Sequence, residues 1–318
     1  PLLCYNILNK AEVDHMKYGI IDLGSNTIRL VIFKYENEVL SKTLNVKRST
    51  QAISYVENGE LTPVGIKAVT LALRELLLIA KAFDVDEMHI FATASLRNIT
   101  NTQQAREAIE RNLNIKIDLL SGDEEAVFGF NGVKRGVVLP KVGVSVDIGG
   151  GSSEITYFAN GVPVNSISIP YGSLNMYLKH IRNIVPTAKE HEKMRADIQD
   201  ALSKVDFLTN LKVDNLVGIG GSARSILKIY QAQNNLEESM YELIIPTAEI
   251  TRTSMMVEGK KAAGIKLLLS SVPDRLTTAL PGAIIMDEIC RNVQAKNFML
   301  SRYGVREGYF YSRILKQE

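Results

Sequence analysis

Two segments of this 318-residue chain repeat one pattern, 125 residues apart. MKYGIIDLGSNTIRLVIF (16–33) and VGVSVDIGGGSSEITYF (142–158) each run from an apolar strand through Asp-apolar-Gly and a small polar turn into a second strand. Asp22 and Asp147 hold equivalent positions in the two copies. A pattern that returns in this way indicates two similar halves, and we expect the ligand to bind between them.

Helical and strand patterns alternate through the first half of the chain. Residues 62–82 carry helical periodicity with Thr62-Pro63 as a start signal, and strand patterns follow at 87–93 and 115–120. This alternation is typical of α/β layers. Later in the chain, residues 184–205 and 232–298 have mainly helical patterns. The length corresponds to about two domains of ~150 residues each, and no Gly/Ser linker separates them.

Composition excludes several classes of protein. A net charge of +2 provides no global field for nucleic acid. Two distant cysteines, Cys4 and Cys290, and four scattered histidines give no disulfide framework and disfavour a zinc site or a Ser-His-Asp triad. No apolar run approaches the ~20 residues that a membrane span needs. Residues 1–15 resemble no signal peptide and look like an extension before Met16, so we expect a cytoplasmic protein.

Both repeated turns are candidates for binding phosphate. Their glycines let backbone N–H groups approach an anion, and an aspartate at the end of the preceding strand can hold Mg²⁺ near phosphate oxygens. Two chance hairpin turns are the alternative, which the matching copies disfavour. The GGGS segment leads into a strand, and no Gly-Lys-Ser/Thr occurs, so neither a Rossmann dinucleotide site nor a Walker A loop fits.

Two further segments are candidates for the same site. Ser95 and Arg97 follow a strand, where an arginine can clamp phosphate, although a solvated loop arginine explains Arg97 equally well. Gly220-Gly221-Ser222 follows another strand and begins a helix. That segment is either an anion-contact turn or a close packing of helix on strand.

An acidic helix start at residues 121–126 supplies the candidate general base. Ser121 and Glu124 have capping-box spacing, which gives Glu124 a structural role, and acids are common in a first helical turn. Asp123 and Glu125 remain without such a role. A carboxylate near a phosphate site is a natural general base for water.

Taken in order, these motifs resemble the family of exopolyphosphatases and guanosine pentaphosphate phosphohydrolases, within the superfamily of actin, sugar kinases and Hsp70. The resemblance runs from about Met16 to the C-terminus. It is carried by DLGSNT (22–27) with Arg29, TAS (93–95) with Arg97, SGDEEA (121–126), DIGGGS (147–152) with Glu154, GGS (220–222), LPGA (280–283) and YGVREG (303–308).

The resemblance implies an α/β fold of two ribonuclease H-like domains, as in actin-like ATPases, with the active site in a cleft between them. The first domain is expected at 16–127 together with a C-terminal helix at 300–318. The second is expected at 128–299. A homodimer is also implied, although no interface can be identified in the sequence.

The resemblance further implies Mg²⁺-dependent (or Mn²⁺-dependent) release of terminal phosphate from inorganic polyphosphate or from guanosine pentaphosphate, pppGpp. By matching position, Glu125 is the catalytic base. The substrate-binding positions are Gly24, Ser25, Asn26, Arg29, Ser95, Arg97, Gly149, Gly150, Gly151, Ser152, Gly220, Gly221 and Ser222. The metal positions are Asp147, Glu154 and Asp22.

The chain departs from the family pattern at one strand. KRSTQAI (47–53) stands where the family usually has an Arg-Leu-Gly-like stretch, and only Arg48 is retained. Ser222 replaces a more usual threonine. The chain ends soon after residue 308, which favours short polyphosphate or a nucleotide as substrate. The alternative function is a sensor that binds pppGpp, ppGpp or another nucleotide with little turnover. A phosphotransferase is disfavoured because the resemblance is full-length.

Overall fold

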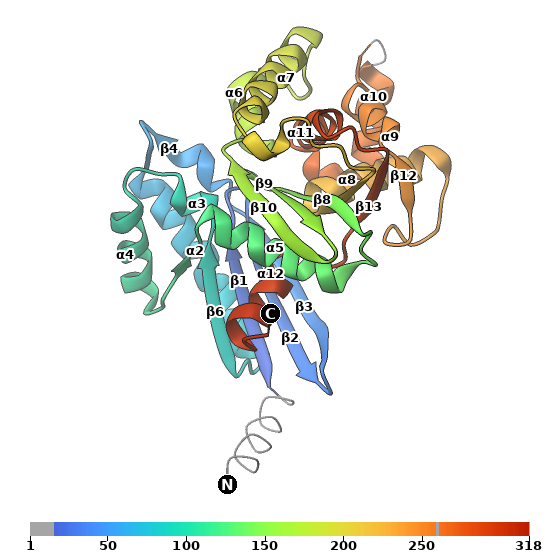
Figure 1. Ribbon diagram of the computed structural model, residues 1–318. Coiled ribbons are helices and arrows are strands. Elements are labelled where there is room, and N and C mark those ends of the chain that lie inside the picture. The colour runs from blue at the N-terminus through green and yellow to red at the C-terminus, as the bar shows by residue number, and fades with distance from the viewer. Residues whose placement is uncertain (1–15, 259–260, 318) are drawn as a thin grey trace. The chain divides into compact units, whose positions relative to one another are not determined.

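Each repeated segment lies at the centre of its own sheet in the structure, a computed structural model that describes residues 16–258 and 261–317. The chain divides into two units between Ser121 and Gly122 (Figure 1). The extension expected at residues 1–15 lies outside the described residues.

The first unit contains a five-stranded sheet. Its strands are β1 (Lys17–Leu23), β2 (Thr27–Glu36), β3 (Val39–Ser49), β6 (Glu87–Ala92) and β7 (Asp118–Leu119), in the order β3-β2-β1-β6-β7. β2 runs antiparallel to its neighbours β1 and β3, whereas β6 and β7 run parallel to β1. The remaining elements are η1 (Ala52–Tyr55), β4 (Val56–Glu57), β5 (Glu60–Leu61), α2 (Pro63–Ala82), α3 (Ala94–Arg97) and α4 (Thr102–Leu113).

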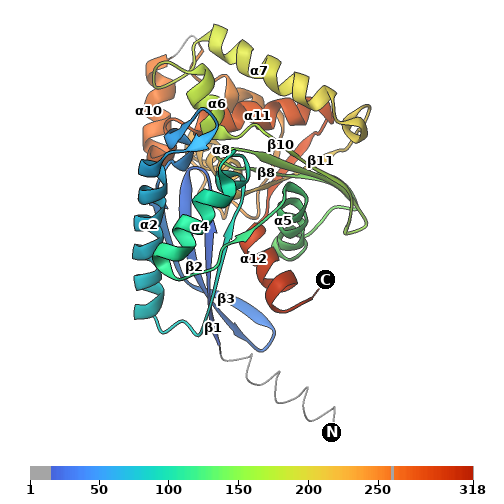
Figure 2. The same cartoon turned by 90° about the vertical axis from the view of Figure 1, so that its left-hand side faces the viewer.

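Helix α2 begins where the sequence predicts and covers one face of this sheet (Figure 2). The Thr62 side chain caps it by accepting a hydrogen bond from the backbone N–H of Gly65 at 3.2 Å. Leu73 and Leu76 are fully buried against Ile21 and Leu30 of the sheet. Each such side chain contributes about 1.5–3 kcal/mol by leaving water, so the pairing of helix and sheet stabilises the unit.

The second unit contains a six-stranded sheet. Its strands are β8 (Val142–Ile148), β9 (Ser153–Ala159), β10 (Val162–Ile169), β11 (Asn215–Ile219), β12 (Ile244–Pro246) and β13 (Asn297–Leu300), in the order β10-β9-β8-β11-β13-β12. The helices are α5 (Gly122–Gly136), α6 (Ser173–His180), α7 (Ala188–Ser203), α8 (Gly220–Asn234), α9 (Ala248–Ser254), α10 (Lys261–Ser271), α11 (Ala279–Asn292) and α12 (Val305–Tyr309). Short turns of helix lie at η2 (Asp206–Leu208), η3 (Pro273–Arg275) and η4 (Phe310–Ile314).

The two sheets repeat one topology, which confirms the fold class. Three antiparallel strands come first, followed by two parallel strands on the far side of the first strand. This order is that of a ribonuclease H-like domain. The second unit adds β12, which pairs antiparallel with β13 at the sheet edge. Residues 232–298 are largely helical, as predicted, and the exceptions are β12 and the start of β13, short strands that gain their ladder bonds from distant residues.

The C-terminal helix belongs to the second unit, in contrast to its predicted place in the first domain. Helix α12 packs against α5, where Gly132 lies against the backbone of Gly304 and Gly308 against the carbonyl of Phe128. These glycines allow the two helix backbones to touch, which a Cβ atom would prevent. The boundary after Ser121 also precedes the one predicted at 127, because α5 starts the second unit.

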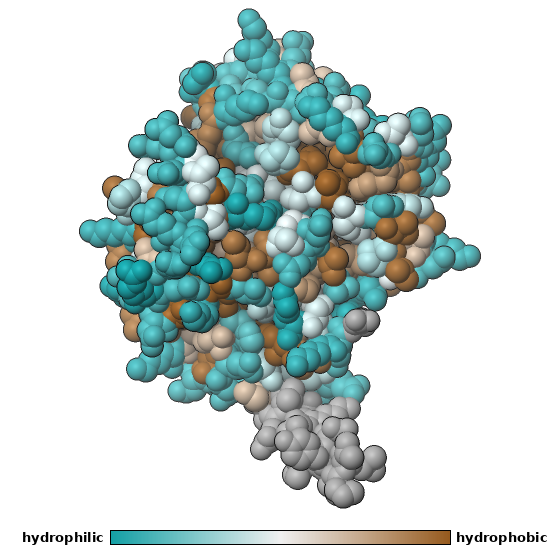
Figure 3. All heavy atoms as spheres, turned by 60° about the vertical axis from the view of Figure 1, so that its left-hand side comes forward, coloured by the Kyte–Doolittle hydropathy of each residue, from teal (hydrophilic) through white to brown (hydrophobic). Residues whose placement is uncertain are grey.

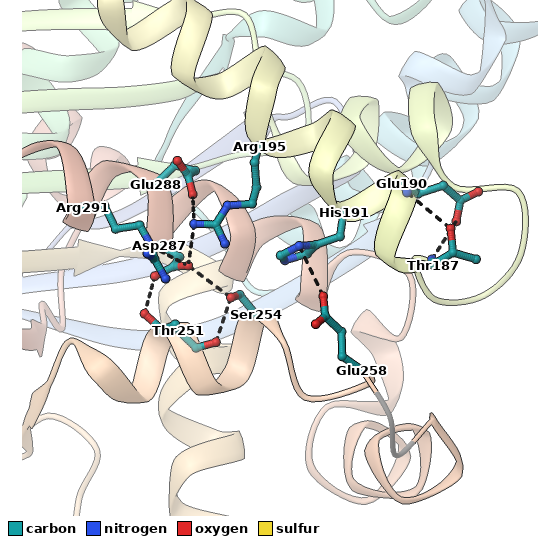
Figure 4. Close-up of polar contacts among 10 residues, drawn as sticks. All are labelled: Thr187, Glu190, His191, Arg195, Thr251, Ser254, Glu258, Asp287, Glu288 and Arg291. Atoms are coloured by element: carbon teal, nitrogen blue, oxygen red, sulfur yellow. Dashed lines mark hydrogen bonds and ion pairs between the residues drawn. The ribbon is translucent and has the colours of Figure 1, made fainter.

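A buried polar network joins α7, α9 and α11 in the second unit (Figure 4). Asp287 and Glu288 on α11 are nearly inaccessible to solvent, and Arg195 of α7 forms ion pairs with both. The Asp287 Oδ1 atom also accepts a hydrogen bond from Thr251 Oγ1 at 2.5 Å. Buried charges persist where partners of this kind replace water, so the network fixes how the three helices pack.

Hydrophilic side chains dominate the face drawn in Figure 3, and apolar residues on it form small groups. Within residues 16–258 and 261–317, no helix combines the length and the apolar character needed to cross a bilayer.

Candidate active site

The turn between β1 and β2 has its carbonyl groups occupied and its central N–H groups unused. Gly24 N donates to the carbonyl of Thr27 at 3.2 Å, and the carbonyl of Asn26 accepts from Gln51 N at 2.9 Å. The carbonyl of Ser25 accepts from Ile53 N at 3.3 Å. Among the described residues, nothing accepts a hydrogen bond from the backbone N–H of Ser25 or Asn26. Such paired N–H groups suit an anion.

The turn between β8 and β9 is held in the same way. Gly149 N donates to the carbonyl of Ser152 at 2.9 Å, as in the first copy. The start of α6 binds the turn from behind: Ser173 N donates to the carbonyl of Gly149 at 2.8 Å, and Asn175 N donates to that of Gly150 at 3.0 Å. No acceptor for the N–H groups of Gly150 and Gly151 lies in the part of the chain that the structure describes.

Gly172 allows this close support. A Cβ atom at this position would lie 2.5 Å from the backbone nitrogen of Gly151, inside any real contact distance. The Asn175 side chain adds a hydrogen bond from Nδ2 to the carbonyl of Gly151 at 2.9 Å. The second turn is therefore a rigid loop whose carbonyls are fixed by α6, which preorganises the N–H groups for a ligand.

Two carboxylates of the second unit lie on neighbouring strands. Asp147 of β8 and Glu154 of β9 are direct cross-strand partners, so their side chains share one face of the sheet. Glu154 is buried, and its Oε1 atom accepts hydrogen bonds from Ser152 Oγ at 2.8 Å and Ser168 Oγ at 2.7 Å. A Cβ atom at Gly220 would lie 2.5 Å from Asp147 Oδ1, so that glycine leaves the aspartate room.

This pair fits a divalent cation that keeps most of its water. Like charges on opposed strand positions destabilise a sheet, and a bound cation would relieve that repulsion. Mg²⁺ takes one or two carboxylates together with water and substrate phosphates. The described residues contain no group of three or more His, Cys, Asp or Glu side chains arranged for a metal, as an all-protein cage would require. Asp22 differs, because Arg29 stands opposite it.

Glu125 lies in the first turn of α5, whose start is packed beside the carboxylate pair. Gly122 begins α5 so close to Ser168 that a Cβ atom would lie 2.7 Å from the serine Cβ. Ser168 in turn binds Glu154. The neighbouring Glu124 has a structural role, as predicted, but through an ion pair with Arg313 at 2.6 Å. The second unit thus carries a helix-start acid and two strand acids on elements that pack together.

Two of the predicted substrate-binding serines donate hydrogen bonds to backbone carbonyls. Ser95 Oγ donates to the carbonyl of Leu23 at the end of β1, and Ser222 Oγ donates to that of Ile148 at the end of β8, at 3.0 Å. The two bonds are equivalent in the two copies. Each hydroxyl has one proton, so these serines fix the starts of α3 and α8 against the strand ends.

The predicted arginines of the first unit also have polar partners. Arg97 Nη1 donates to the carbonyl of Leu120 at 3.0 Å. Leu120 directly precedes Ser121, the last residue of the first unit. Arg29 Nη1 donates to Asn45 Oδ1 on β3 at 2.9 Å. Both guanidinium groups are thereby oriented, and each retains further N–H donors.

Two arginines that the sequence patterns did not single out, Arg224 and Arg275, lie beside the third glycine turn. The guanidinium group of Arg275 lies against Gly221, where a Cβ atom would collide with it. Burial lowers the pKa of Arg275, and the charge of Arg224 lowers it further. Burial also lowers the pKa of Arg224, as does the charge of Arg306. The Asp147 carboxylate acts on both pKa values in the opposite direction.

These arginines bring positive charge to the glycine turn and the carboxylate pair. Partly buried guanidinium groups that repel one another are stabilised by an anion, and planar guanidinium suits phosphate. Arg224 and Arg275 lie outside the quoted motifs, whereas Arg306 lies within YGVREG (303–308), and the three are far apart in sequence. The position of Arg275 shortly before the LPGA segment was the available signal.

Comparison of the chain with known protein families identifies its family. The sequence model of the Ppx/GppA phosphatase family matches residues 34–317. The chain belongs to the Ppx/GppA phosphatase family. It is therefore an enzyme of a hydrolase family that acts on phosphoanhydride bonds, as the names of its curated relatives indicate.

Curated relatives and solved structures support this placement. The chain is similar to exopolyphosphatase 1 of Mycobacterium tuberculosis, with 20% identity over 94% of this chain and 88% of the relative. It is also similar to guanosine-5'-triphosphate,3'-diphosphate pyrophosphatase of Aeromonas hydrophila, with 24% identity over 93% of this chain and 59% of that longer protein. An exopolyphosphatase structure from Cytophaga hutchinsonii shares the fold, with a TM-score of 0.82, 17% identity and coverage of 95% and 99% of the two chains.

Proposed function

We propose that the chain releases the terminal phosphate of inorganic polyphosphate or of pppGpp, with water as the nucleophile and Glu125 as the general base. The observation that carries the proposal is the pair of matched turns, each with its carbonyls tied back and its central N–H groups left for an anion. The activities for which the relatives are named, exopolyphosphatase and guanosine-5'-triphosphate,3'-diphosphate pyrophosphatase, are the two forms of this reaction.

The chain's own groups supply what phosphoryl transfer requires. The transition state needs positioning and charge stabilisation more than covalent chemistry. The N–H groups of Ser25, Asn26, Gly150 and Gly151 would bind phosphate oxygens. Arg275 and the oriented Arg29 would balance their charge. A Mg²⁺ ion held by Asp147 and Glu154 would neutralise further phosphate charge when bound.

Glu125 would orient the attacking water and accept its proton. The bond from the water oxygen to the terminal phosphorus forms as the bond from that phosphorus to the bridging oxygen breaks. The electron pair of the broken bond stays on the shortened substrate, which leaves as an anion. The proton taken by Glu125 returns to solvent or to the released phosphate.

One observation favours the alternative of a nucleotide sensor. Arg48, the retained member of the family's Arg-Leu-Gly-like stretch, has its Nε atom 2.7 Å from Glu75 Oε2 on α2. It is thus engaged on the helix-covered face of the sheet. Because Arg48 is engaged there, a sensor that binds a guanosine polyphosphate with little turnover is the second candidate function.

Phosphate release by the purified protein with Mg²⁺ tests the proposal. Long-chain polyphosphate, short-chain polyphosphate, pppGpp and ATP are offered to the wild type, to Glu125→Gln and to Asp123→Asn. We expect release from a polyphosphate or from pppGpp, and a loss of at least about a hundredfold in Glu125→Gln. Asp123→Asn removes the same charge from the same helical turn and serves as the matched control.

The outcomes separate the two candidates. Unchanged turnover in Glu125→Gln would refute the base assignment. Binding without release from any substrate would establish the sensor instead. We further propose, on the family resemblance, a cytoplasmic homodimer, which sedimentation of the purified chain would test.

A further inference from the structure

Three charged residues form a row across the sheet of the first unit. Asp22 on β1 stands directly opposite Arg29 on β2, and Arg29 stands directly opposite Lys47 on β3. Directly opposed residues point to the same face, and neighbouring strands lie about 4.8 Å apart, so the row spans about 10 Å.

The row lies on the face opposite α2. Leu44 and Val46 pack into the apolar cluster beneath α2, and Arg48 forms its ion pair with Glu75 of α2. Side chains alternate along a strand, so Asn45 and Lys47 lie on the other face. The hydrogen bond of 2.9 Å from Arg29 Nη1 to Asn45 Oδ1 shows that Arg29 shares that face.

Arg29 and Lys47 concentrate positive charge at one place on this face. Lys47 is exposed on a strand that ends the sheet. Asp22 balances one of these two charges from the other side of Arg29, and Lys47 at the end of the row adds the positive charge that favours the binding of an anion. The row lies two residues from the Gly24 turn along β1, about 7 Å away, so one extended anion could reach both.

We propose that Lys47, together with Arg29, binds phosphate oxygens of the substrate that are remote from the bond being cleaved. The inference rests on the proposed function. It assigns a role in substrate recognition to a position where the chain departs from its family's usual residues. The remote oxygens belong either to further units of a polyphosphate chain or to the 3′-diphosphate of pppGpp.

A purely protective role for Lys47 is the competing explanation. Lysines on edge strands prevent a sheet from pairing with another chain. Lys42 on the same strand can serve that purpose as well, and its Nζ atom lies 5.9 Å from the centre of the Phe33 ring. Five residues of strand separate it from Lys47, about 17 Å. It is therefore a matched control for charge on β3.

Steady-state kinetics with Mg²⁺ test the proposal on tripolyphosphate, long-chain polyphosphate and pppGpp. We expect Lys47→Met to raise KM by roughly threefold to tenfold, the value of one partly exposed charged contact. Lys47→Arg should restore KM to within about twofold, and the salt dependence of KM should weaken in Lys47→Met. Lys42→Met should leave KM within about twofold of the wild-type value.

The substrates distinguish the sources of the anion. A rise confined to long-chain polyphosphate would place later chain units at Lys47, and a rise confined to pppGpp would place the 3′-diphosphate there. An unchanged KM for all three in Lys47→Met, with Glu125→Gln inactive, would overturn this inference and leave the proposed function standing. If the wild type binds these substrates without turnover, dissociation constants from titration calorimetry replace KM. The same ratios of variant to wild-type values then test the role of Lys47. If it neither binds nor cleaves any of the three, the proposed function fails and this inference with it.

Discussion

Glu154 lies directly opposite Asp147, in the place that Arg29 holds opposite Asp22 in the other copy. The duplicated hairpin thus carries two acids in one unit and an acid with a base in the other. The first arrangement suits a cation, whereas the second pairs opposite charges. One repeated backbone therefore carries two different charge patterns at equivalent positions.

The carboxylate pair predicts a dependence on divalent metal. Glu154→Gln should lower kcat by about a hundredfold to a thousandfold and raise the Mg²⁺ concentration for half-maximal activity, because one of two charges at the site is lost. Direct Mn²⁺ binding, followed by electron paramagnetic resonance, should weaken in the same variant. Asp214→Asn, which breaks a surface pair with Lys296, should change neither quantity.

We predict that Gly220→Ala loses more activity than backbone strain alone would cause. It has a φ of +75°, and a Cβ atom there would strike Asp147. Gly161 has a φ of +74° with nothing within 4 Å, so Gly161→Ala measures the strain alone, about 1 kcal/mol of unfolding free energy. We expect Gly220→Ala to lose more stability in urea and most of its phosphate release. Equal behaviour of the two variants would show that Asp147 needs no such room.

Because of the buried network, we predict that substitutions of two arginines differ greatly in their effect on the free energy of unfolding. Arg195→Leu leaves Asp287 and Glu288 with less compensation, and we expect a loss of about 3–5 kcal/mol in urea unfolding. Arg252 forms a surface pair with Glu249 and is 65% exposed, so Arg252→Leu should cost less than about 1 kcal/mol. Similar losses in both variants would mean that burial of the network contributes little.

His191 predicts a decline of stability in acid. Burial lowers its pKa from the usual 6.5, Glu258 and the acids Asp287 and Glu288 oppose that shift, and Arg195 adds to it. Its Nε2 atom has no hydrogen-bond partner among the described residues, and Nδ1 lies 3.6 Å from Glu258 Oε1 (Figure 4).

The direction in which stability changes with pH follows from the lowered pKa of His191. Above pH 6.5 the imidazole is neutral in both states and its contribution is complete. As pH falls below 6.5 toward the folded-state pKa, the unfolded chain binds the proton first and stability is lost. Urea unfolding between pH 5 and 8 should show a shallower slope in His191→Gln than in the wild type.

Local sequence determined the repeated hairpins, the α/β alternation and the capped start of α2. Each depends on residues within a few positions: Asp-apolar-Gly with small turn residues, and Thr62 before Pro63. Periodicity and turn chemistry act over such distances. The equivalence of Asp22 and Asp147 was therefore visible in the sequence, and it extends to equal hydrogen bonds in both turns.

Tertiary structure decided the rest, because side chains distant in sequence meet only through packing. The hydroxyls of Ser95 and Ser222 donate to carbonyls at the ends of β1 and β8, which are more than seventy residues away in sequence. Arg275 reached Gly221 from a segment more than fifty residues away. The C-terminal helix joined the second unit through contacts between glycines of α5 and α12. Sequence named the candidate groups of a phosphate site, whereas long-range packing decided which backbone groups and side chains they contact.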